Sequence, residues 1–396
     1  MFAWEQRKLG EVATRVTRKN KNLESTLPLT ISARLGLVDQ ISYFDKRIAS
    51  SNLTNYILLN RGEFAYNKSY SNGYPFGTVK RLNRYDKGVI PSLYIAFMPN
   101  TIFINSDFME MYFETSLWHK EVSARASEGA RNHGLLNISP SDFMDIYMKI
   151  PEKIEEQKKI AKFLEDFDSL ITLHQRKLEH LQEQKKGLLQ KMFPKNGEVV
   201  PEVRFPGFTD AWEQRKLNEF LKTSKLKNEN NKFTRKDVLS VSGDYGIVNQ
   251  IKFKGRSFAG ASVQKYRIVN TNDVVYTKSP LKNNPYGIIK ANKGNPGIVS
   301  TLYAVYKINE KVNASFIEYY FENDYRLNTY LKPLVNKGAK NDMKVSDDNA
   351  LIGNVIFPLE YSEQIKIVKF LNRFDTLIAL HQRKVKYLIS TLVVYL

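Results

Sequence analysis

The feature that most constrains this chain is an internal repeat. Residues 3–9 (Ala-Trp-Glu-Gln-Arg-Lys-Leu) recur without change at 211–217, and most of 160–181 recurs at 367–388. This period far exceeds the roughly 20–50 residues of a solenoid unit. The sequence therefore predicts a duplicated domain together with a duplicated helix.

Between the repeated ends, short runs rich in β-branched and aromatic residues are bounded by Gly, Pro and Asn. They include 64–67 and 94–97 in the first copy and 273–277 and 302–306 in the second. Such runs indicate strands, so we expect an α+β fold with two homologous mixed domains and two long helices. The expected order is a domain at 1–151, a helix at 152–193, a linker at 194–210, a domain at 211–357 and a helix at 358–396.

Each predicted helix carries apolar residues at alternating spacings of four and three, which is typical of a coiled-coil seam. Because two matched seams occur in one chain, we expect them to pair with each other. His174 and His381 occupy equivalent seam positions, where a polar residue usually fixes the register. Two histidines alone make a weak metal site, so we expect no metal. The predicted seam residues are Ile160, Leu164, Phe167, Ile171, His174, Leu178, Leu181, Ile367, Leu371, Phe374, Ile378, His381, Val385 and Leu388.

The charge balance indicates a polyanionic partner. The chain has 60 Lys and Arg residues against 41 Asp and Glu, a formal net charge of +19, and such an excess is typical of nucleic-acid-binding proteins. The absence of cysteine excludes disulfides, thiolate metal sites and cysteine nucleophiles, and it favours a reducing cytoplasm. No apolar run approaches the roughly 18 residues of a membrane span.

The usual motifs of nucleotide and metal chemistry are missing. A Gly-Lys dipeptide never occurs, which excludes a phosphate-binding P-loop, and there is no His-Glu-x-x-His zinc motif. Residues 283–286 (Asn-Asn-Pro-Tyr) are similar to a loop of adenine methyltransferases but lack its second proline, so we interpret them as a turn. We therefore expect neither a cofactor nor a catalytic site in this chain.

Basic, aromatic and amide residues gather in predicted loops at corresponding positions of the two copies. Arg and Lys bind phosphates or guanine, Asn pairs with adenine, and Tyr contacts bases or sugars. For any single residue, a solvated basic rim is the alternative. The candidate DNA contacts in the first copy are Lys68, Ser69, Tyr70, Asn72, Tyr74, Lys80, Arg81 and Arg84. Those in the second copy are Lys278, Ser279, Lys282, Asn283, Asn284, Tyr286, Lys290 and Lys293.

A second pair of candidate loops precedes the helices, and each contains a Gly-Ala-cation sequence, at 129–131 and 338–340. A glycine lets backbone amides approach a phosphate closely, and the cation that follows neutralises it. A plain turn is the alternative. The candidate DNA contacts here are Arg125, Arg131, Asn132, His133, Lys337, Lys340, Asn341 and Lys344.

The duplicated motifs resemble one known family. Each copy opens with Trp-Glu-Gln-Arg-Lys-Leu and closes with Gln-x-x-Ile-x-x-Phe-Leu-x-x-Phe-Asp, at 157–168 and 364–375. This arrangement resembles the DNA specificity subunit of type I restriction–modification systems over essentially the whole chain. Two features depart from an even repeat: residues 389–396 do not match 182–189, and 201–210 have no counterpart before Ala3.

The resemblance implies two homologous mixed target-recognition domains separated by two long helices that pair as an antiparallel coiled coil. Each domain then reads one half of a bipartite, asymmetric site in double-stranded DNA. It implies as partners two modification subunits, which methylate adenine with S-adenosylmethionine, and two ATP-dependent restriction subunits that cleave DNA. The chain itself is then a non-catalytic subunit. The alternatives are a stand-alone duplicated enzyme that modifies or cleaves DNA, and a structural adaptor that binds no DNA.

Overall fold

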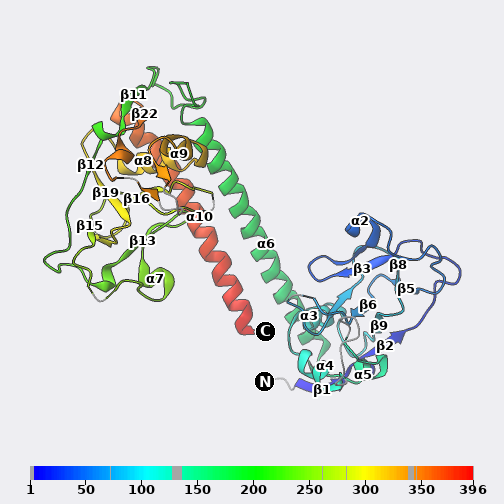
Figure 1. Cartoon of the computed structure of the whole chain (residues 1–396). Coiled ribbons are helices and arrows are strands. Elements are labelled where there is room, and N and C mark those ends of the chain that lie inside the picture. Colours follow the sequence, from blue (N-terminus) through cyan, green and yellow to red (C-terminus); the bar gives the residue numbers. More distant parts are fainter. Residues whose placement is uncertain are drawn as a thin grey trace. The chain divides into compact units, whose positions relative to one another are not determined.

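The computed structural model describes residues 4–71, 73–126, 136–260, 262–281, 283–337, 343–344 and 346–395. The chain divides into two compact units: unit 1 is Met1–Leu173 with Lys386–Leu396, and unit 2 is His174–Val385. Each unit holds a mixed domain of strands and short helices together with part of two long helices, α6 (Ile154–Lys191) and α10 (Tyr361–Tyr395) (Figure 1). The fold is α+β, as the sequence predicts.

A four-stranded antiparallel sheet forms the centre of unit 1. Its strands are, in spatial order, β2 (Ala13–Val16), β9 (Ile95–Pro99), β6 (Phe64–Asn67) and β7 (Thr78–Arg81). Three two-stranded ladders accompany it: β1 (Trp4–Lys8) with β10 (Tyr147–Pro151), β3 (Leu29–Ser32) with β4 (Gly36–Asp39), and β5 (Ile57–Asn60) with β8 (Lys87–Ile90). The short helices are α1 (Leu9–Val12), α2 (Gln40–Phe44), α3 (Ser106–Glu114), α4 (His119–Arg125) and α5 (Pro140–Met144).

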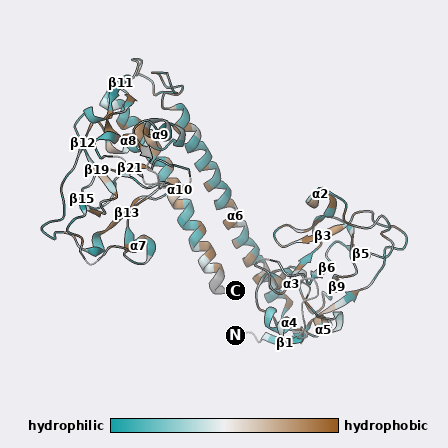
Figure 2. Cartoon of the chain, viewed as in Figure 1, coloured by the Kyte–Doolittle hydropathy of each residue, from teal (hydrophilic) through white to brown (hydrophobic). Residues whose placement is uncertain are grey.

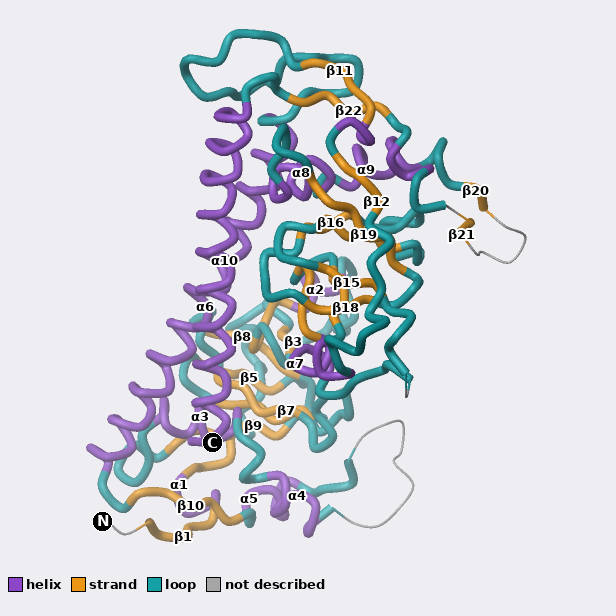
Figure 3. The backbone as a smooth tube through the Cα atoms, turned by 90° about the vertical axis from the view of Figure 1, so that its left-hand side faces the viewer, coloured by secondary structure: helices purple, strands orange, loops and turns teal. Residues whose placement is uncertain are grey.

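Unit 2 repeats this sheet in the same order: β12 (Leu221–Thr223), β19 (Tyr303–Ile308), β16 (Val274–Thr277) and β17 (Ile289–Ala291). Its ladders pair β11 (Glu213–Lys216) with β22 (Asn354–Phe357), β13 (Leu239–Ser242) with β14 (Gly246–Asn249), β15 (Arg267–Val269) with β18 (Gly297–Val299), and β20 (Asn336–Lys337) with β21 (Met343–Lys344). Figure 3 shows β11 beside β22. The helices are α7 (Gln250–Lys254), α8 (Ala314–Phe321) and α9 (Asp324–Leu331), and the 3₁₀ turns are Leu217–Glu219, Arg235–Asp237 and Asn349–Leu351.

Both faces of the central strands are buried. Phe64 and Tyr66 of β6 join the core that contains α3, whereas Ala65 joins a separate cluster with residues of β5 and β8. Because successive side chains of a strand point to opposite faces, a strand covered on both sides reads as a continuous apolar run. Residues of β16 divide in the same way, with Val275 on the other face from its neighbours.

One glutamine anchors each long helix to its own domain. Gln157, near the start of α6, is fully buried; its Oε1 accepts the Asn105 N–H at 2.7 Å and its Nε2 donates to the Phe103 carbonyl. Gln364 of α10 makes the equivalent bonds to Asn313 and Lys311. These bonds satisfy backbone groups just ahead of α3 and α8, which gives the glutamine of the repeated helix motif a structural role.

Within unit 2, the two long helices pair antiparallel. His174 contacts His381, and further along the helices Lys185 contacts Asp375. Leu189 and Leu371 lie in one core cluster. Hydrophilic and hydrophobic residues alternate along both helices (Figure 2), as an amphipathic seam requires. Among the described residues, no helix is long and apolar enough to cross a membrane.

Candidate nucleic-acid interface

In unit 1, the predicted DNA-contact loop after strand β6 is bonded to the residues that follow 127–135. The Lys68 carbonyl accepts the Leu136 N–H at 2.9 Å, and the Lys68 ammonium donates to the Ile138 carbonyl at 3.1 Å. Leu136 directly follows 127–135, which lie outside the described residues. Lys68 therefore ties the loop after β6 to the end of the segment that contains the first Gly-Ala-cation sequence.

Unit 2 brings the corresponding segments together through a different contact. Lys278, which follows β16, forms an ion pair with Asp347, and Arg267 pairs with the same carboxylate. The Asp347 carbonyl also accepts the Tyr306 hydroxyl at 2.9 Å. Asp347 follows the segment that holds the second Gly-Ala-cation sequence. Two cations face one carboxylate here, so this contact leaves a positive charge.

A glycine shapes the loop after β6 and the loop after β16. Gly77 and Gly287 adopt positive φ angles of +81° and +89°, and an added Cβ would lie 2.3 Å from the Asn67 carbonyl oxygen and 1.9 Å from the Thr277 carbonyl oxygen. Only glycine fits such a turn. The hydroxyls of Tyr66 and Tyr276 donate to the Phe76 and Tyr286 carbonyls, both at 2.7 Å. Residues 283–286 are therefore part of a turn, as the sequence predicts.

Several candidates in these loops reach solvent. Tyr70, Ser279 and Asn283 are exposed. Half-buried candidates are Lys68, Ser69, Tyr74, Lys278, Asn284 and Tyr286. Asn284 donates to Asp324 Oδ1 at 2.9 Å, and this bond fixes the second loop against α9.

Other predicted contacts lie apart from this end of the sheet. Arg84 is exposed, but it follows β7 at the opposite end of the β6–β7 hairpin. Arg81 forms ion pairs with Asp107 at 2.7 Å and with Glu110 at 2.6 Å. These contacts point its guanidinium at α3.

Two predicted lysines are buried under helices. Lys80 is 8% exposed and pairs with Glu114, while Lys290 is 6% exposed and lies 3.7 Å from Glu318. A buried charge requires a partner, and α3 and α8 supply one. In this structure both lysines join strand to helix and present no charge to solvent.

Arg125 is bound within its own domain. Its guanidinium lies 2.6 Å from Glu121 Oε2 and 5.5 Å from the centre of the Tyr147 ring. The other candidates near it fall outside the described residues, as do several in the remaining loops: Asn72, Arg131, Asn132, His133, Lys282, Lys340 and Asn341. For Lys337 and Lys344 the structure describes the backbone pairing of β20 with β21 and not the side chains.

A basic and aromatic surface lies at α7 and in the residues that flank it, and the sequence patterns did not single it out. Lys254 lies 4.7 Å from the Phe253 ring centre, Arg256 lies 4.9 Å from the Phe258 ring centre, and Tyr245 packs against Phe253. Phe258 is 60% exposed and Tyr245 58%. Exposed aromatic rings beside cations suit base stacking and phosphate contact.

The equivalent region of unit 1 has the same character. Tyr43 and Phe44 of α2 are exposed with ring centres 4.9 Å apart, and Lys46 and Arg47 follow them in exposed positions. A signal was present in the sequence, because Gln40-Ile41 and Gln250-Ile251 align and both precede aromatic and basic residues.

The predicted seam residues are all buried or half-buried in the structure. His174 Nδ1 lies 2.9 Å from His381 Nδ1, so one ring must donate and the other accept. Among the residues that the structure describes, no group of three or more His, Asp and Glu side chains could hold a metal ion.

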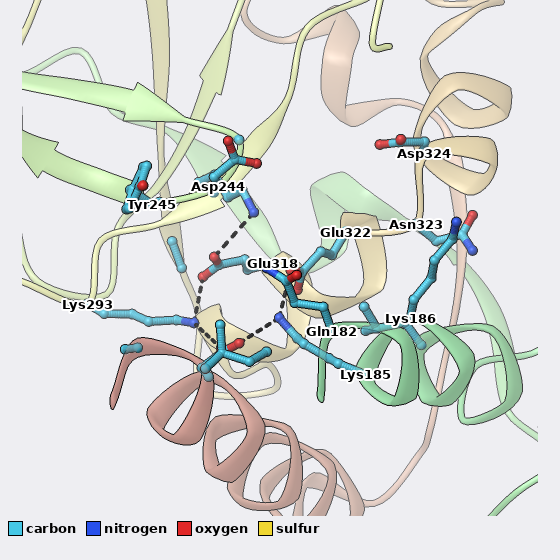
Figure 4. Close-up of a pocket in the computed structure, with 18 of the residues that line it drawn as sticks. Gln182, Lys185, Lys186, Asp244, Tyr245, Lys293, Glu318, Glu322, Asn323 and Asp324 are labelled. Carbon is cyan, nitrogen blue, oxygen red and sulfur yellow. Dashed lines mark hydrogen bonds and ion pairs between the residues drawn. The ribbon is translucent and has the colours of Figure 1, made fainter. Parts of the chain in front are cut away.

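A charged pocket of about 1070 Å³ lies within unit 2 between the domain and the helix pair (Figure 4). Lys185 is at its centre, 2.7 Å from Glu322 and 2.6 Å from Asp375. Burial lowers the pKa of Lys185, but the two carboxylates outweigh it, so the pKa lies above its ordinary value. Lysines and carboxylates are nearly balanced in the lining, which includes Lys185, Lys186, Lys290, Lys293, Asp244, Glu318, Glu322, Asp324 and Asp375. A lining with balanced charges does not suit a polyanionic ligand. The ion pairs of Lys185 in this pocket connect the end of α8 to the two long helices.

A family model for the type I restriction modification DNA specificity domain matches residues 3–183. The chain is 27% identical over 253 residues to the putative type I restriction enzyme MjaX specificity subunit of Methanocaldococcus jannaschii, covering 60% of this chain and 55% of that protein. It is 35% identical over 86 residues to the type I restriction enzyme MjaVIII specificity subunit of the same organism, covering 22% and 20%. The matches thus span about half and a fifth of these relatives' lengths.

Among solved structures, the type I restriction–modification system S subunit from M. genitalium is similar to this chain with a TM-score of 0.58 and 14% identity. The likeness covers 98% of this chain and 94% of that one, and it shows a shared fold. The chain is a relative of the specificity subunits, which confirms the resemblance that its duplicated motifs indicate.

Proposed function

We propose that this chain is a non-catalytic subunit that reads a bipartite, asymmetric site in double-stranded DNA, with one half-site for each domain. Bound DNA is then methylated at adenine or cleaved by partner subunits, two for modification and two for restriction. The expected compartment is the cytoplasm. The observation that carries this proposal is that two segments converge in each unit. Lys68 and Lys278, which follow β6 and β16, each bind the segment that comes after a Gly-Ala-cation sequence.

This convergence supports DNA reading for a physical reason. Backbone amides and cations position a duplex through its phosphates, while exposed amide and aromatic side chains specify bases. The described groups at this end of the central sheets are Lys68 and the exposed Tyr70 in unit 1, and Lys278 with the exposed Ser279 and Asn283 in unit 2. We assign structural roles to Lys80, Arg81 and Lys290. We assign direct contact with DNA to Tyr70, Ser279 and Asn283, and to the candidates that lie outside the described residues: Asn72, Arg131, Asn132, His133, Lys282, Lys340 and Asn341.

The proposal is tested with Arg131→Ala and Lys340→Ala, which remove one cation from each Gly-Ala-cation sequence. Affinity for duplex DNA should fall for each, and the slope of log affinity against log salt should decrease by about one unit if the contact is to phosphate. Lys162→Ala is the control, because this 67% exposed lysine lies on α6 in pairs with Glu165 and Asp166. Loss of affinity equal to that of the control would contradict the assignment.

The main rival is a stand-alone enzyme. Incubating the purified chain with DNA, Mg²⁺ and S-adenosylmethionine distinguishes these two hypotheses. Cleavage or methyl transfer by the chain alone would overturn a non-catalytic role. A structural adaptor differs from both in showing no salt-dependent DNA binding.

A further inference from the structure

A cluster of exposed cations lies at α7 in unit 2, on the side of the domain opposite to β11 and β22 (Figure 1). Its members lie on α7, on the neighbouring 3₁₀ turn Arg235–Asp237 and in the residues beside these two elements. Within the part of the chain that the structure describes, no carboxylate forms an ion pair with any of them. This α7 cluster consists of Lys232, Arg235, Lys236, Lys252, Lys254 and Arg256.

Two amide side chains hold the elements of the α7 cluster together. Asn249 Oδ1 accepts the Lys252 N–H at 3.1 Å and caps the start of α7, while Asn249 Nδ2 donates to the Lys236 carbonyl at 2.7 Å. Gln250 Oε1 accepts the Phe258 N–H at 2.6 Å, which holds the residues after α7 against the helix. The cations of the turn and of the helix are therefore fixed on one part of the surface.

The positive charge of the α7 cluster is not cancelled by its surroundings. Phe253 and Phe258, and not carboxylates, lie beside Lys254 and Arg256. An aromatic ring attracts and orients a cation but carries no net charge. Asp237, the carboxylate of the 3₁₀ turn, accepts a backbone N–H and a hydroxyl from the residue that caps the turn. The cluster therefore presents net positive charge to solvent.

The corresponding part of unit 1 lacks this excess of charge. Residues 249–258 contain three cations and no acid, a net formal charge of +3, whereas residues 39–48, which align with them, contain two cations and two acids, a net charge of 0. Arg47, one of those two cations, also donates to the carbonyls of Ser50 and Ser51. The excess is thus a property of unit 2 and not a requirement of the shared fold.

The amides beside the α7 cluster are already engaged, which argues against base reading there. Asn249 uses both its oxygen and its nitrogen within the domain. Gln250 does the same, since its Nε2 donates to Ser240 Oγ at 3.1 Å. An asparagine or glutamine reads adenine by offering both groups to the base. Exposed cations without carboxylate partners suit phosphates instead.

We propose that the α7 cluster of unit 2 binds the DNA backbone, with Lys252, Lys254 and Arg256 in contact with phosphates, and adds affinity without sequence preference. The inference rests on the proposed function and deepens it, because it assigns a phosphate-binding surface to one of the two homologous domains. DNA suits the cluster because a duplex carries one negative charge per about 1.7 Å of its axis, a density that closely spaced cations can match.

The test measures binding of the full chain to a duplex of unselected sequence over a range of salt concentrations. The variant combines Lys252→Ala, Lys254→Ala and Arg256→Ala. Its affinity should fall at least about tenfold, and the slope of log affinity against log salt should decrease by about 2–3 units, because three phosphate contacts are lost. All three side chains are exposed, so the variant should stay folded, as circular dichroism would show.

The matched control combines Lys159→Ala, Lys369→Ala and Lys384→Ala, three exposed lysines of α6 and α10, and removes the same charge. It should lose much less affinity and keep the slope of the unaltered chain. Duplex selection with the α7 variant should return the same conserved blocks as the unaltered chain. Equal losses in variant and control, or altered blocks, would overturn the inference and leave the proposed function standing. If the unaltered chain binds no duplex, the proposed function fails and the inference fails with it.

Discussion

The Nδ1 atoms of His174 and His381 lie 2.9 Å apart across the antiparallel helix pair. Burial lowers the pKa of His381, and the positive charges of His174, Lys384 and Lys177 lower it further. A base whose pKa is depressed by folding is protonated more readily in the unfolded chain. Its contribution to stability is therefore present above the unfolded pKa of about 6.5 and is lost as the pH falls through the folded value.

We expect acid to loosen the helix pair at this position. The chain has five histidines, so NMR can follow each imidazole, and His381 should titrate below about 6.5. The double variant His174→Leu with His381→Leu should keep its helix content and lose much of the change in stability between pH 7 and pH 5. Equal acid sensitivity in the double variant would show that the imidazole pair does not set it.

Lys185 holds α8 to the helix pair through Glu322 and Asp375. Lys185→Ala leaves two carboxylates facing each other and should reduce the free energy of unfolding of unit 2 by about 2–4 kcal/mol. This is less than the loss for a fully sealed pair, because Asp375 is 37% exposed. Lys186→Ala, on the same helix and exposed, should cost less than about 0.5 kcal/mol. Urea unfolding measures both, and equal losses would remove the proposed role.

The two glycines in the loop after β6 predict alanine variants that differ in their loss of stability. Gly73 has a φ of +83° with nothing within 4 Å of an added Cβ, so Gly73→Ala should cost about 1–2 kcal/mol for its backbone angle alone. Gly77→Ala adds a collision with the Asn67 carbonyl and should cost clearly more. Hydrogen exchange of β6 and β7 would report the difference. A smaller effect at Gly77 than at Gly73 would contradict the close approach.

The sequence predicted the strands and long helices well because both carry strong local patterns. Strands β6 and β16 are apolar on both faces, and the helices keep a regular seam. α6 begins and ends within a turn of the predicted helix, a difference expected where helix ends fray.

The roles of single cations were not predictable in the same way. Lys80 and Lys290 resemble solvent-facing lysines in the sequence, yet Glu114 and Glu318 cover them from helices far along the chain. Nothing in the local pattern encodes those partners. The same holds for Trp4 and Trp212, which lie in identical heptapeptides and differ in exposure, because Arg204 and Phe193 contribute to the environment of Trp212.

The proposed function requires that the two homologous domains read two halves of one DNA site. Selection of bound duplexes from a randomised DNA pool with the full chain measures this requirement. We expect two short, different conserved blocks separated by a gap of fixed length and free sequence. One continuous block, or no enrichment at any salt concentration, would contradict it.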